Sequence, residues 1–232
     1  GEVDGIQGVI RDVTDRKMIE NSLKLQLKYS NALNRLMELV ISSDITEEIL
    51  PDVTKIIGEA LDIDRALIYQ IKFDAEILVG LAEWKNENNP EVKSTIGNYP
   101  INILKKCIEQ MYKNRLPEIS NASNPNKLLL DDKAIDLIHK DMGTKSGIWV
   151  PFAFSENSFY MFAFNQLNYE REWAEEDLKF IDSCTKQINL AIQKDVLLKE
   201  KYLIEFAMRG QEEKYQLLAQ HSSDIISLYD KN

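Results

Sequence analysis

The chain has 232 residues, 44% of them hydrophobic, and a formal net charge of −10 at pH 7. This length and composition allow one or two globular domains, and the lack of grouped Lys and Arg argues against binding to nucleic-acid phosphates. The longest apolar runs, 77–82 and 148–154, are far shorter than the roughly 20 residues that span a bilayer, and two cysteines make no disulfide framework. We therefore expect a cytoplasmic segment with no nucleic-acid partner and no membrane contact.

Residues 15–42 predict a first long helix with a wide apolar face. Two neighbouring heptad-spaced seams run along it, one through Leu23 and Leu33, the other through Tyr29 and Leu36. A two-stranded coiled coil needs only one narrow stripe, so two seams indicate packing against more than one partner.

After residue 65 the apolar period changes from helical to alternating, which predicts strands. Two hairpins are expected, 66–73 with 77–86 and 146–154 with 158–166, and a short strand is expected at 116–119. Residues 87–100 and 121–127 are expected to be loops. Four further helices are expected, at 45–61, 102–113, 131–142 and 174 to about 220. In the first of them Asp44 is the expected N-cap and Pro51 an expected kink, and in the last Gly210 is a candidate break. This order predicts an α+β fold, an antiparallel sheet with helices on its faces, flanked by long N- and C-terminal linker helices.

Two motifs in the second half of the sheet region are similar to those of GAF domains. Residues 143–152 (Gly-Thr-Lys-Ser-Gly-Ile-Trp-Val-Pro-Phe) resemble the family's Gly-x-x-Ser-hydrophobic-x-Val-Pro strand, and 169–178 resemble its Arg-x-Trp-x-x-Glu-Asp entry to the last helix. Residues 115–119 with Asn124-Pro125 resemble its third strand and trailing loop. The final hairpin departs from the family because residues 155–160 contain no glycine.

The two ends of the chain resemble parts of PAS domains. Residues 8–17 (Gly-Val-Ile-Arg-Asp-Val-Thr-Asp-Arg-Lys) look like the last PAS strand and the start of a signalling helix, and the final residues look like the opening of a second PAS domain. The expected division is the end of a PAS domain at 1–17, a signalling helix at 18–43, a GAF domain at 44–194, a linker helix at 195–211 and the start of a PAS domain at 212–232.

The GAF resemblance implies a small-molecule site between the sheet and the irregular region 99–139. The candidate lining residues are aromatic, sulfur-containing, apolar or imidazole side chains of that region and the facing strands: Tyr69, Trp84, Cys107, Ile108, Met111, His139 and Trp149. The alternative interpretation is that these side chains only form the core.

The sequence does not identify a cofactor. A covalent bilin is not expected, because the resemblance to phytochromes would need a cysteine followed by His, and Cys107 is followed by Ile108. Haem is not expected at His139, since no second ligand is evident. Asn126-Lys127 partly matches a cyclic-nucleotide motif, which we regard as coincidental because the rest of the motif is missing.

No catalytic or metal-binding residue is predicted in this segment. His221 lacks the Glu-x-Arg-x-Pro pattern that follows a phosphoacceptor histidine, and no Walker, Gly-x-Gly-x-x-Gly, His-Glu-x-x-His or Cys-x-x-Cys motif occurs. A remote alternative is methionine sulfoxide reduction, which GAF-like proteins perform with clustered cysteines. Cys107 and Cys184 are expected in separate helices, which argues against it.

The predicted function is sensing and relay within a multidomain signal-transduction protein, of sensor histidine kinase type with its catalytic part outside this segment. The expected partners are a second copy of the chain, a small molecule, and adjacent PAS and kinase domains. The residues expected to pair the flanking helices of a homodimer are apolar and heptad-spaced: Leu23, Leu33, Leu36, Val40, Ile181, Ile188 and Ile192. The alternative is a structural dimerisation and relay module without a ligand.

Overall fold

The computed structural model describes residues 14–43, 46–89 and 92–229 of the chain. Its strands are β1 (Arg65–Lys72), β2 (Ile77–Lys85), β3 (Asn98–Pro100), β4 (Glu118–Asn121), β5 (Ser146–Phe152) and β6 (Ser158–Gln166). Its helices are α1 (Thr14–Ser42), α2 (Thr46–Leu61), α3 (Lys105–Asn114), α4 (Asp132–Ile135) and α5 (Glu175–Tyr229), with a 3₁₀ helix η1 (Ile101–Leu104) and a π-helix η2 (Asp136–Asp141). The Asp44 N-cap, residues 1–13 of the predicted PAS end and residues 230–232 lie outside the described residues.

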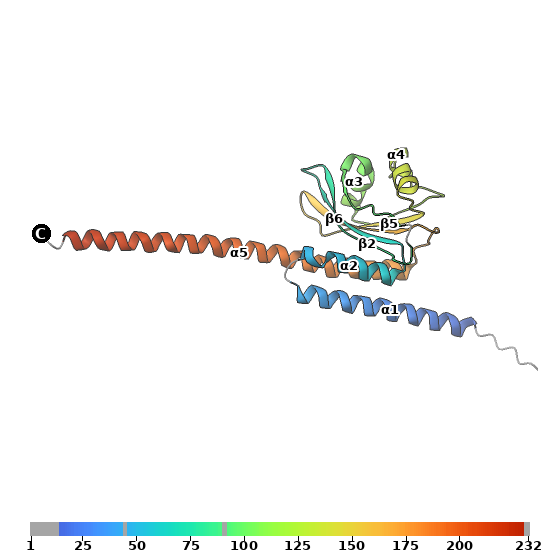
Figure 1. The fold of residues 1–232 in the computed structure, drawn as a ribbon, viewed down its shortest axis with the longest axis horizontal. Coiled ribbons are helices and arrows are strands. Elements are labelled where there is room, and N and C mark those ends of the chain that lie inside the picture. Colours follow the sequence, from blue (N-terminus) through green and yellow to red (C-terminus); the bar gives the residue numbers. More distant parts are fainter. Residues whose placement is uncertain (1–13, 44–45, 90–91, 230–232) are drawn as a thin grey trace, which may run out of the picture.

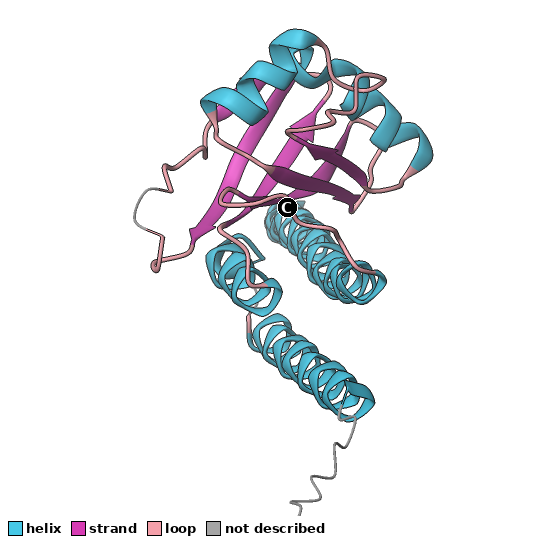
Figure 2. Ribbon diagram, turned by 90° about the vertical axis from the view of Figure 1, so that its right-hand side faces the viewer, coloured by secondary structure: helices cyan, strands magenta, loops and turns pink. Residues whose placement is uncertain are grey.

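The strands form one six-stranded antiparallel sheet in the order β3-β2-β1-β6-β5-β4. The short helices around α3 and α4 cover one face, and α2 with the first part of α5 covers the other (Figures 1 and 2). Helix α1 lies beneath α2 and α5 and forms a further layer. The predicted α+β architecture is confirmed, including both long terminal helices.

Side-chain alternation divides the core into two parts, one on each face of the sheet. In β1, Leu67, Tyr69 and Ile71 point toward the short helices, whereas Ala66 and Ile68 point toward α2 and α5. A period of two in a strand places alternate residues on opposite faces, so each strand supplies both cores.

Helices α1 and α5 run in the same direction, and α2 runs back between them (Figure 1). Helix α5 is 55 residues long, which corresponds to about 80 Å at 1.5 Å per residue. It continues through Gly210, so the break considered there does not occur. Every described side chain from Lys199 to Glu213 is exposed, and this part of α5 projects beyond the sheet (Figure 1).

Two elements differ from the sequence prediction. The expected loop 87–100 ends in strand β3, which pairs with the first three residues of β2, and a three-residue edge strand carries too little alternation to detect. The expected helix 131–142 consists of one α-helical turn followed by the π-helix η2. Both differences fall on the side of the sheet where the candidate site lies.

Candidate ligand-binding site

A small, partly open cavity lies between the sheet and the layer of short helices. Its volume is about 50 Å³. The sheet contributes Leu67, Tyr69, Leu78, Tyr99, Pro100, Trp149, Met161, Ala163 and Asn165, and the covering segments contribute Thr95, Ile103, Leu104, Leu137, Ile138, Met142 and Thr144. A cavity of this size has room for a few water molecules, whereas pockets for drug-sized ligands are roughly 300–1,000 Å³.

Hydroxyl groups gather at one part of the wall. Tyr69 and Tyr99 each donate a hydrogen bond from the phenol to the carbonyl oxygen of Thr95, at 2.9 and 2.7 Å. Thr144 follows Gly143, whose φ of 69° is readily available only to glycine. This turn directs the chain from η2 into β5 and places Thr144 in the cavity wall.

Arg65 is completely buried next to this polar part of the wall. Its Nη1 donates to the carbonyl oxygen of Lys93 at 3.1 Å, and its Nη2 donates to the carbonyl oxygen of Met142 and the hydroxyl of Thr144 at 3.4 and 3.3 Å. Its Nε has no hydrogen-bond partner among the described residues. Burial lowers the pKa of Arg65 from its ordinary value, while the charge of Glu83 acts in the opposite direction.

Two of the predicted site residues, Tyr69 and Trp149, line the cavity. Cys107, Ile108 and Met111 belong to the buried core on the same face of the sheet, behind the cavity wall. Sequence reasoning missed Arg65 because a charged residue at the start of a strand looks like a surface residue. The alternation through Leu67, Tyr69 and Ile71 was the signal that places it on a buried face.

Trp84 lies on the opposite face of the sheet, against α2, and not on the cavity side. The pairing of β1 with β2 shifts between Ile68 and Tyr69, which leaves Leu81 as an extra residue in β2. Such a bulge reverses the alternation, so Leu78 faces the cavity while Trp84, six residues later, faces α2. A bulge of this kind has no clear signal in the sequence.

His139 is buried, and both of its ring nitrogens have protein partners. Nδ1 is 2.7 Å from the carbonyl oxygen of Thr144, and Nε2 is 2.8 Å from the Ser120 hydroxyl. A carbonyl oxygen can only accept, so Nδ1 carries the proton and Nε2 accepts from Ser120. The imidazole therefore ties η2 to β4 and β5, and neither nitrogen is free for haem iron.

The two cysteines lie in different cores, with the sheet between them. Cys107 belongs to α3 and packs on one face of the sheet, and Cys184 belongs to α5 and packs in the core on the other face. Burial, assisted by the charge of Glu118, raises the pKa of Cys107 to about 12, and burial also raises the pKa of Cys184. Two separated neutral thiols are unsuited to the attack and resolution steps of a sulfoxide reductase.

Most of the residues that were predicted to pair the flanking helices of a dimer pack within one copy of the chain. Leu36, Ile181 and Ile188 are buried in the core formed by α1, α2, α5 and the sheet. The partly buried Leu33, Val40 and Ile192 pack against that core, while Leu23 is 64% exposed. The seam of α1 that runs through Tyr29 and Leu36 thus packs against the rest of the same chain.

A polar cluster fastens α1 to the beginning of α5. The buried Asp177 carboxylate accepts a hydrogen bond from the Tyr29 hydroxyl. It also forms an ion pair with Arg171, with 2.9 Å between Oδ2 of Asp177 and Nη2 of Arg171. Arg171 also donates to the carbonyl oxygen of Leu61 at the end of α2, at 2.7 Å. The Tyr29 ring stacks on Phe180 with centroids 4.2 Å apart. Three helices therefore meet at one carboxylate.

In residues 14–43, 46–89 and 92–229 there is no group of three or more His, Cys, Asp or Glu side chains placed to hold a metal ion. Among the same residues, every helix is too short or too polar to cross a membrane.

Comparison with proteins of known structure identifies the fold. No protein-family profile matches the chain. The phycocyanobilin-bound GAF domain of a cyanobacterial phytochrome is similar with a TM-score of 0.63 and 20% identity, over 73% of this chain and 96% of that chain. Free methionine-R-sulfoxide reductase from Neisseria meningitidis has a TM-score of 0.58 and 12% identity, over 75% and 93% of the two chains. Residues 122 to 287 of a methyl-accepting chemotaxis protein have a TM-score of 0.55 and 16% identity, over 71% and 98%.

The chain therefore has the GAF-like fold that the motifs predicted. The similar structures come from a photoreceptor, an enzyme and a chemotaxis protein, so the fold alone does not define a ligand. In sequence, the chain is 34% identical over 100 residues to the methanogenesis regulatory histidine kinase FilI of Methanothrix harundinacea (strain 6Ac). This match spans 41% of the chain and 11% of that relative, so it concerns one part of a much longer protein.

Proposed function

We propose that this chain is the sensory GAF module of a multidomain signal-transduction protein of the sensor histidine kinase type. In this proposal a small molecule binds in the cavity between the sheet and the short helices, and helices α1 and α5 of two copies relay the signal. The similarity to a regulatory histidine kinase, to the GAF domain of a cyanobacterial phytochrome and to part of a methyl-accepting chemotaxis protein supports the sensory role. Adjacent PAS domains and a kinase belong to the proposal, as parts of the longer protein.

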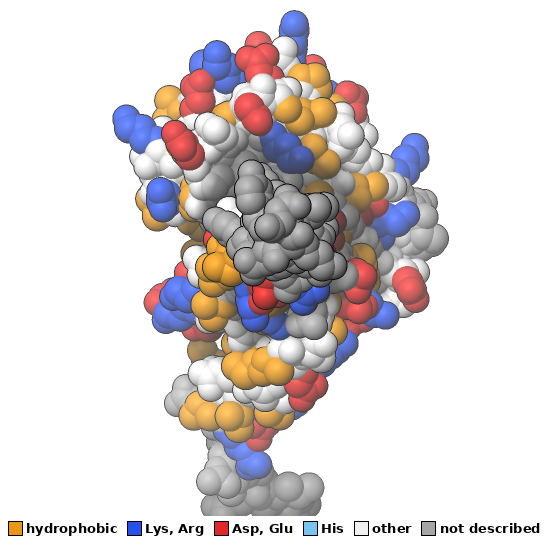
Figure 3. All heavy atoms as spheres, turned by 90° about the vertical axis from the view of Figure 1, so that its left-hand side faces the viewer, with side chains coloured by type: hydrophobic (Ala, Val, Ile, Leu, Met, Phe, Trp, Pro, Cys, Tyr) orange, Lys and Arg blue, Asp and Glu red, His pale blue; other side chains and the backbone are white. Residues whose placement is uncertain are grey.

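The observation that carries the relay is a set of exposed apolar side chains on α5 that begins beside the sheet and continues into the projecting part. These side chains include two neighbouring heptad-spaced rows, with Leu190, Leu197 and Ile204 in one and Val196 and Leu203 in the other. A lone helix in water gains nothing from such rows, whereas a second copy of the same helix would bury them as a parallel pair. Figure 3, a view along the long helices, also shows hydrophobic side chains at the surface on the lower part of the molecule, where α1 lies.

Light scattering after size-exclusion chromatography tests the dimer. The unchanged chain is expected to run as a dimer at micromolar concentration. Leu203→Glu is expected to weaken self-association at least tenfold, because it places a charge in an apolar seam. The matched control is Tyr202→Glu, which adds the same charge at a side chain that is 68% exposed on the same helix but lies outside both rows. A monomeric unchanged chain at high micromolar concentration would contradict the relay.

A second candidate function is a structural module that keeps two helices in register without any ligand. The small volume of the cavity favours this structural role, because the protein's own side chains fill most of the space and the fold needs no metabolite to complete it. Native mass spectrometry of the purified chain separates the two candidates. A sensor is expected to retain or accept a small molecule and to gain thermal stability from it, since binding to the native state alone stabilises by mass action.

A further inference from the structure

The charge of Arg65 has no counter-charge in contact with it. Among the described residues no carboxylate lies within 4 Å of its guanidinium, and its described partners are two backbone carbonyl groups and one hydroxyl. A guanidinium stays protonated in proteins, so its charge is buried together with the side chain. Hydrogen bonds to neutral acceptors compensate the burial of a charge less than an ion pair does, and the charges of Glu83 and Asp64 act on Arg65 only from a distance, which makes this arrangement unusual for a purely structural residue.

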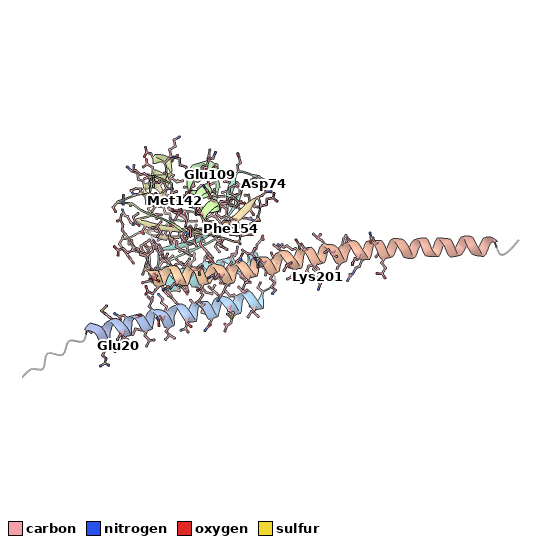
Figure 4. All side chains as sticks on the ribbon, turned by 180° about the vertical axis from the view of Figure 1, so that it is seen from behind. Glu20, Asp74, Glu109, Met142, Phe154 and Lys201 are labelled. Atoms are coloured by element: carbon pink, nitrogen blue, oxygen red, sulfur yellow. The ribbon has the colours of Figure 1, made fainter. Side chains whose placement is uncertain are left out.

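Arg65 is oriented toward the cavity side of the sheet. It occupies the same face of β1 as Leu67 and Tyr69, both of which line the cavity. Two of its acceptors, Met142 and Thr144, also line the cavity. Figure 4 shows Met142 in the layer of short helices, on the far side of the sheet from α5. The hydroxyls of Tyr69, Tyr99 and Thr144 therefore belong to the cavity wall, and the buried cation of Arg65 lies directly behind it, in hydrogen-bond contact with the wall residues Met142 and Thr144.

Most of the remaining wall is apolar, with Asn165 as a polar exception. Its apolar part includes aliphatic and thioether side chains: Leu67, Leu78, Ile103, Leu104, Leu137, Ile138 and Met161. A fully hydrated inorganic anion would gain nothing from these side chains. An organic anion would place its charge against Arg65 and its hydrocarbon part against this wall.

We propose that the cavity is a binding site for a small organic carboxylate, with the carboxylate paired to Arg65 and the hydrocarbon part between the sheet and helices η1 and η2. This inference rests on the ligand-binding part of the proposed function and gives it a chemical class. The unpaired Nε of Arg65 is available as a second donor beside the terminal nitrogens, so the guanidinium has the donors for a carboxylate.

The covering elements are suited to admitting such a molecule. The wall opposite the sheet is made by η1, a 3₁₀ helix of four residues, and η2, a π-helix of six residues. These helix types have weaker hydrogen-bond geometry than an α-helix, and π-helical turns often occur at functional sites. Because the cavity is only about 50 Å³, the ligand is expected to be small and to displace η1 or η2 when it binds.

The test compares molecules of nearly equal shape on the unchanged chain. Isobutyrate, isobutyramide and inorganic phosphate are titrated at pH 7 and constant ionic strength in chloride, and binding is followed by thermal unfolding and by NMR of the protein amides. Isobutyrate is expected to raise Tm in a saturable manner and to shift the amides of the cavity-lining residues. Isobutyramide and phosphate are expected to do neither, because one lacks the charge and the other lacks the hydrocarbon part.

Two variants assign the response to Arg65. Arg65→Gln keeps donors for the carbonyl groups but removes the charge, and is expected to weaken isobutyrate binding roughly tenfold or more. Arg35→Gln removes an arginine that is 55% exposed on α1, and is expected to leave binding unchanged. If Arg65→Gln does not fold, the comparison of isobutyrate with isobutyramide on the unchanged chain still decides the question.

Several outcomes would overturn the inference: no response to isobutyrate, an equal response to isobutyramide, an equal response to phosphate, or an unchanged affinity in folded Arg65→Gln. None of these would by itself refute the sensory relay, which is judged separately by the oligomeric state and by the retention of any other small molecule. A neutral molecule that shifts the cavity amides while isobutyrate does not would retain the ligand site and reject the carboxylate.

Discussion

Asp177 accepts hydrogen bonds from side chains that are far apart in the sequence, Tyr29 on α1 and Arg171 in the segment before α5. In the sequence, Asp177 belongs to the motif that leads into the last helix, and an acidic residue in a first turn is explained by the positive end of the helix dipole alone. That role does not require burial, yet the carboxylate is almost fully buried. The difference arises because its partner Tyr29 is 148 residues away, a separation that no local pattern encodes.

Tyr29→Phe tests this contact without removing the aromatic ring. The variant keeps the stack on Phe180 but takes one donor from a buried carboxylate, so the free energy of unfolding is expected to fall by about 1–2 kcal/mol. Chemical denaturation followed by circular dichroism measures the change. The control, Tyr202→Phe, removes a hydroxyl from a side chain that is 68% exposed and is expected to change stability by less than about 0.5 kcal/mol. Equal effects in the two variants would show that Tyr29 does not fasten α1 to α5.

At the scale of single elements, the sequence predicted most helices and the long strands correctly because their periods of 3.6 and 2 extend over many residues. It failed where structure depends on pairing between strands. Strand β3 has three residues and follows the register of β2, and the bulge beside Leu81 reverses the faces of Leu78 and Trp84. Two of the seven predicted site residues, Tyr69 and Trp149, line the cavity because alternation within β1 and β5 is regular. The bulge places Trp84 on the opposite face of the sheet.

The same bulge directs Trp84 against Gly58 of α2, which makes Gly58 a test of helix–sheet packing. A Cβ at Gly58 would lie 2.1 Å from Cε3 of the Trp84 ring, so Gly58→Ala forces the helix or the ring to move. Overpacking typically costs about 1–3 kcal/mol, which exceeds the gain of about 1 kcal/mol expected for replacing glycine by alanine in a helix. The variant is therefore expected to unfold at lower denaturant concentration than the unchanged chain.

The control for Gly58→Ala is Gly210→Ala in α5, where a Cβ would meet nothing within 4 Å. This variant makes the same chemical change in a helix and is expected to leave stability unchanged or to increase helicity slightly. A double-mutant cycle with Trp84→Leu completes the test. If Gly58→Ala is as destabilising with Leu at position 84 as with Trp, the contact with the ring is not the cause.

At the scale of the whole molecule, α1 and α5 contribute to the domain in different ways. Helix α1 buries Tyr29, Ala32 and Leu36 within one copy of the chain, whereas α5 leaves every described side chain after residue 198 in solvent. In Figure 4, Glu20 marks the start of α1 beneath the domain and Lys201 the part of α5 beyond it. The first helix is thus part of the fold, and the end of the last helix is a surface available to a partner.

Two deletions of similar length separate these roles. Removing residues 1–43 takes away three buried side chains and the Tyr29 contact, so the domain is expected to lose on the order of 5 kcal/mol and to bind a hydrophobic dye. Removing residues 199–232 is expected to leave the thermal unfolding of the domain nearly unchanged while reducing self-association, because it takes away Leu203 and Ile204 but no described buried side chain. The measurements are calorimetry and light scattering on both shortened chains and the unchanged chain. If the first deletion is tolerated and the second abolishes folding, α5 rather than α1 completes the core, and the division between a structural helix and a relay helix would have to be reversed.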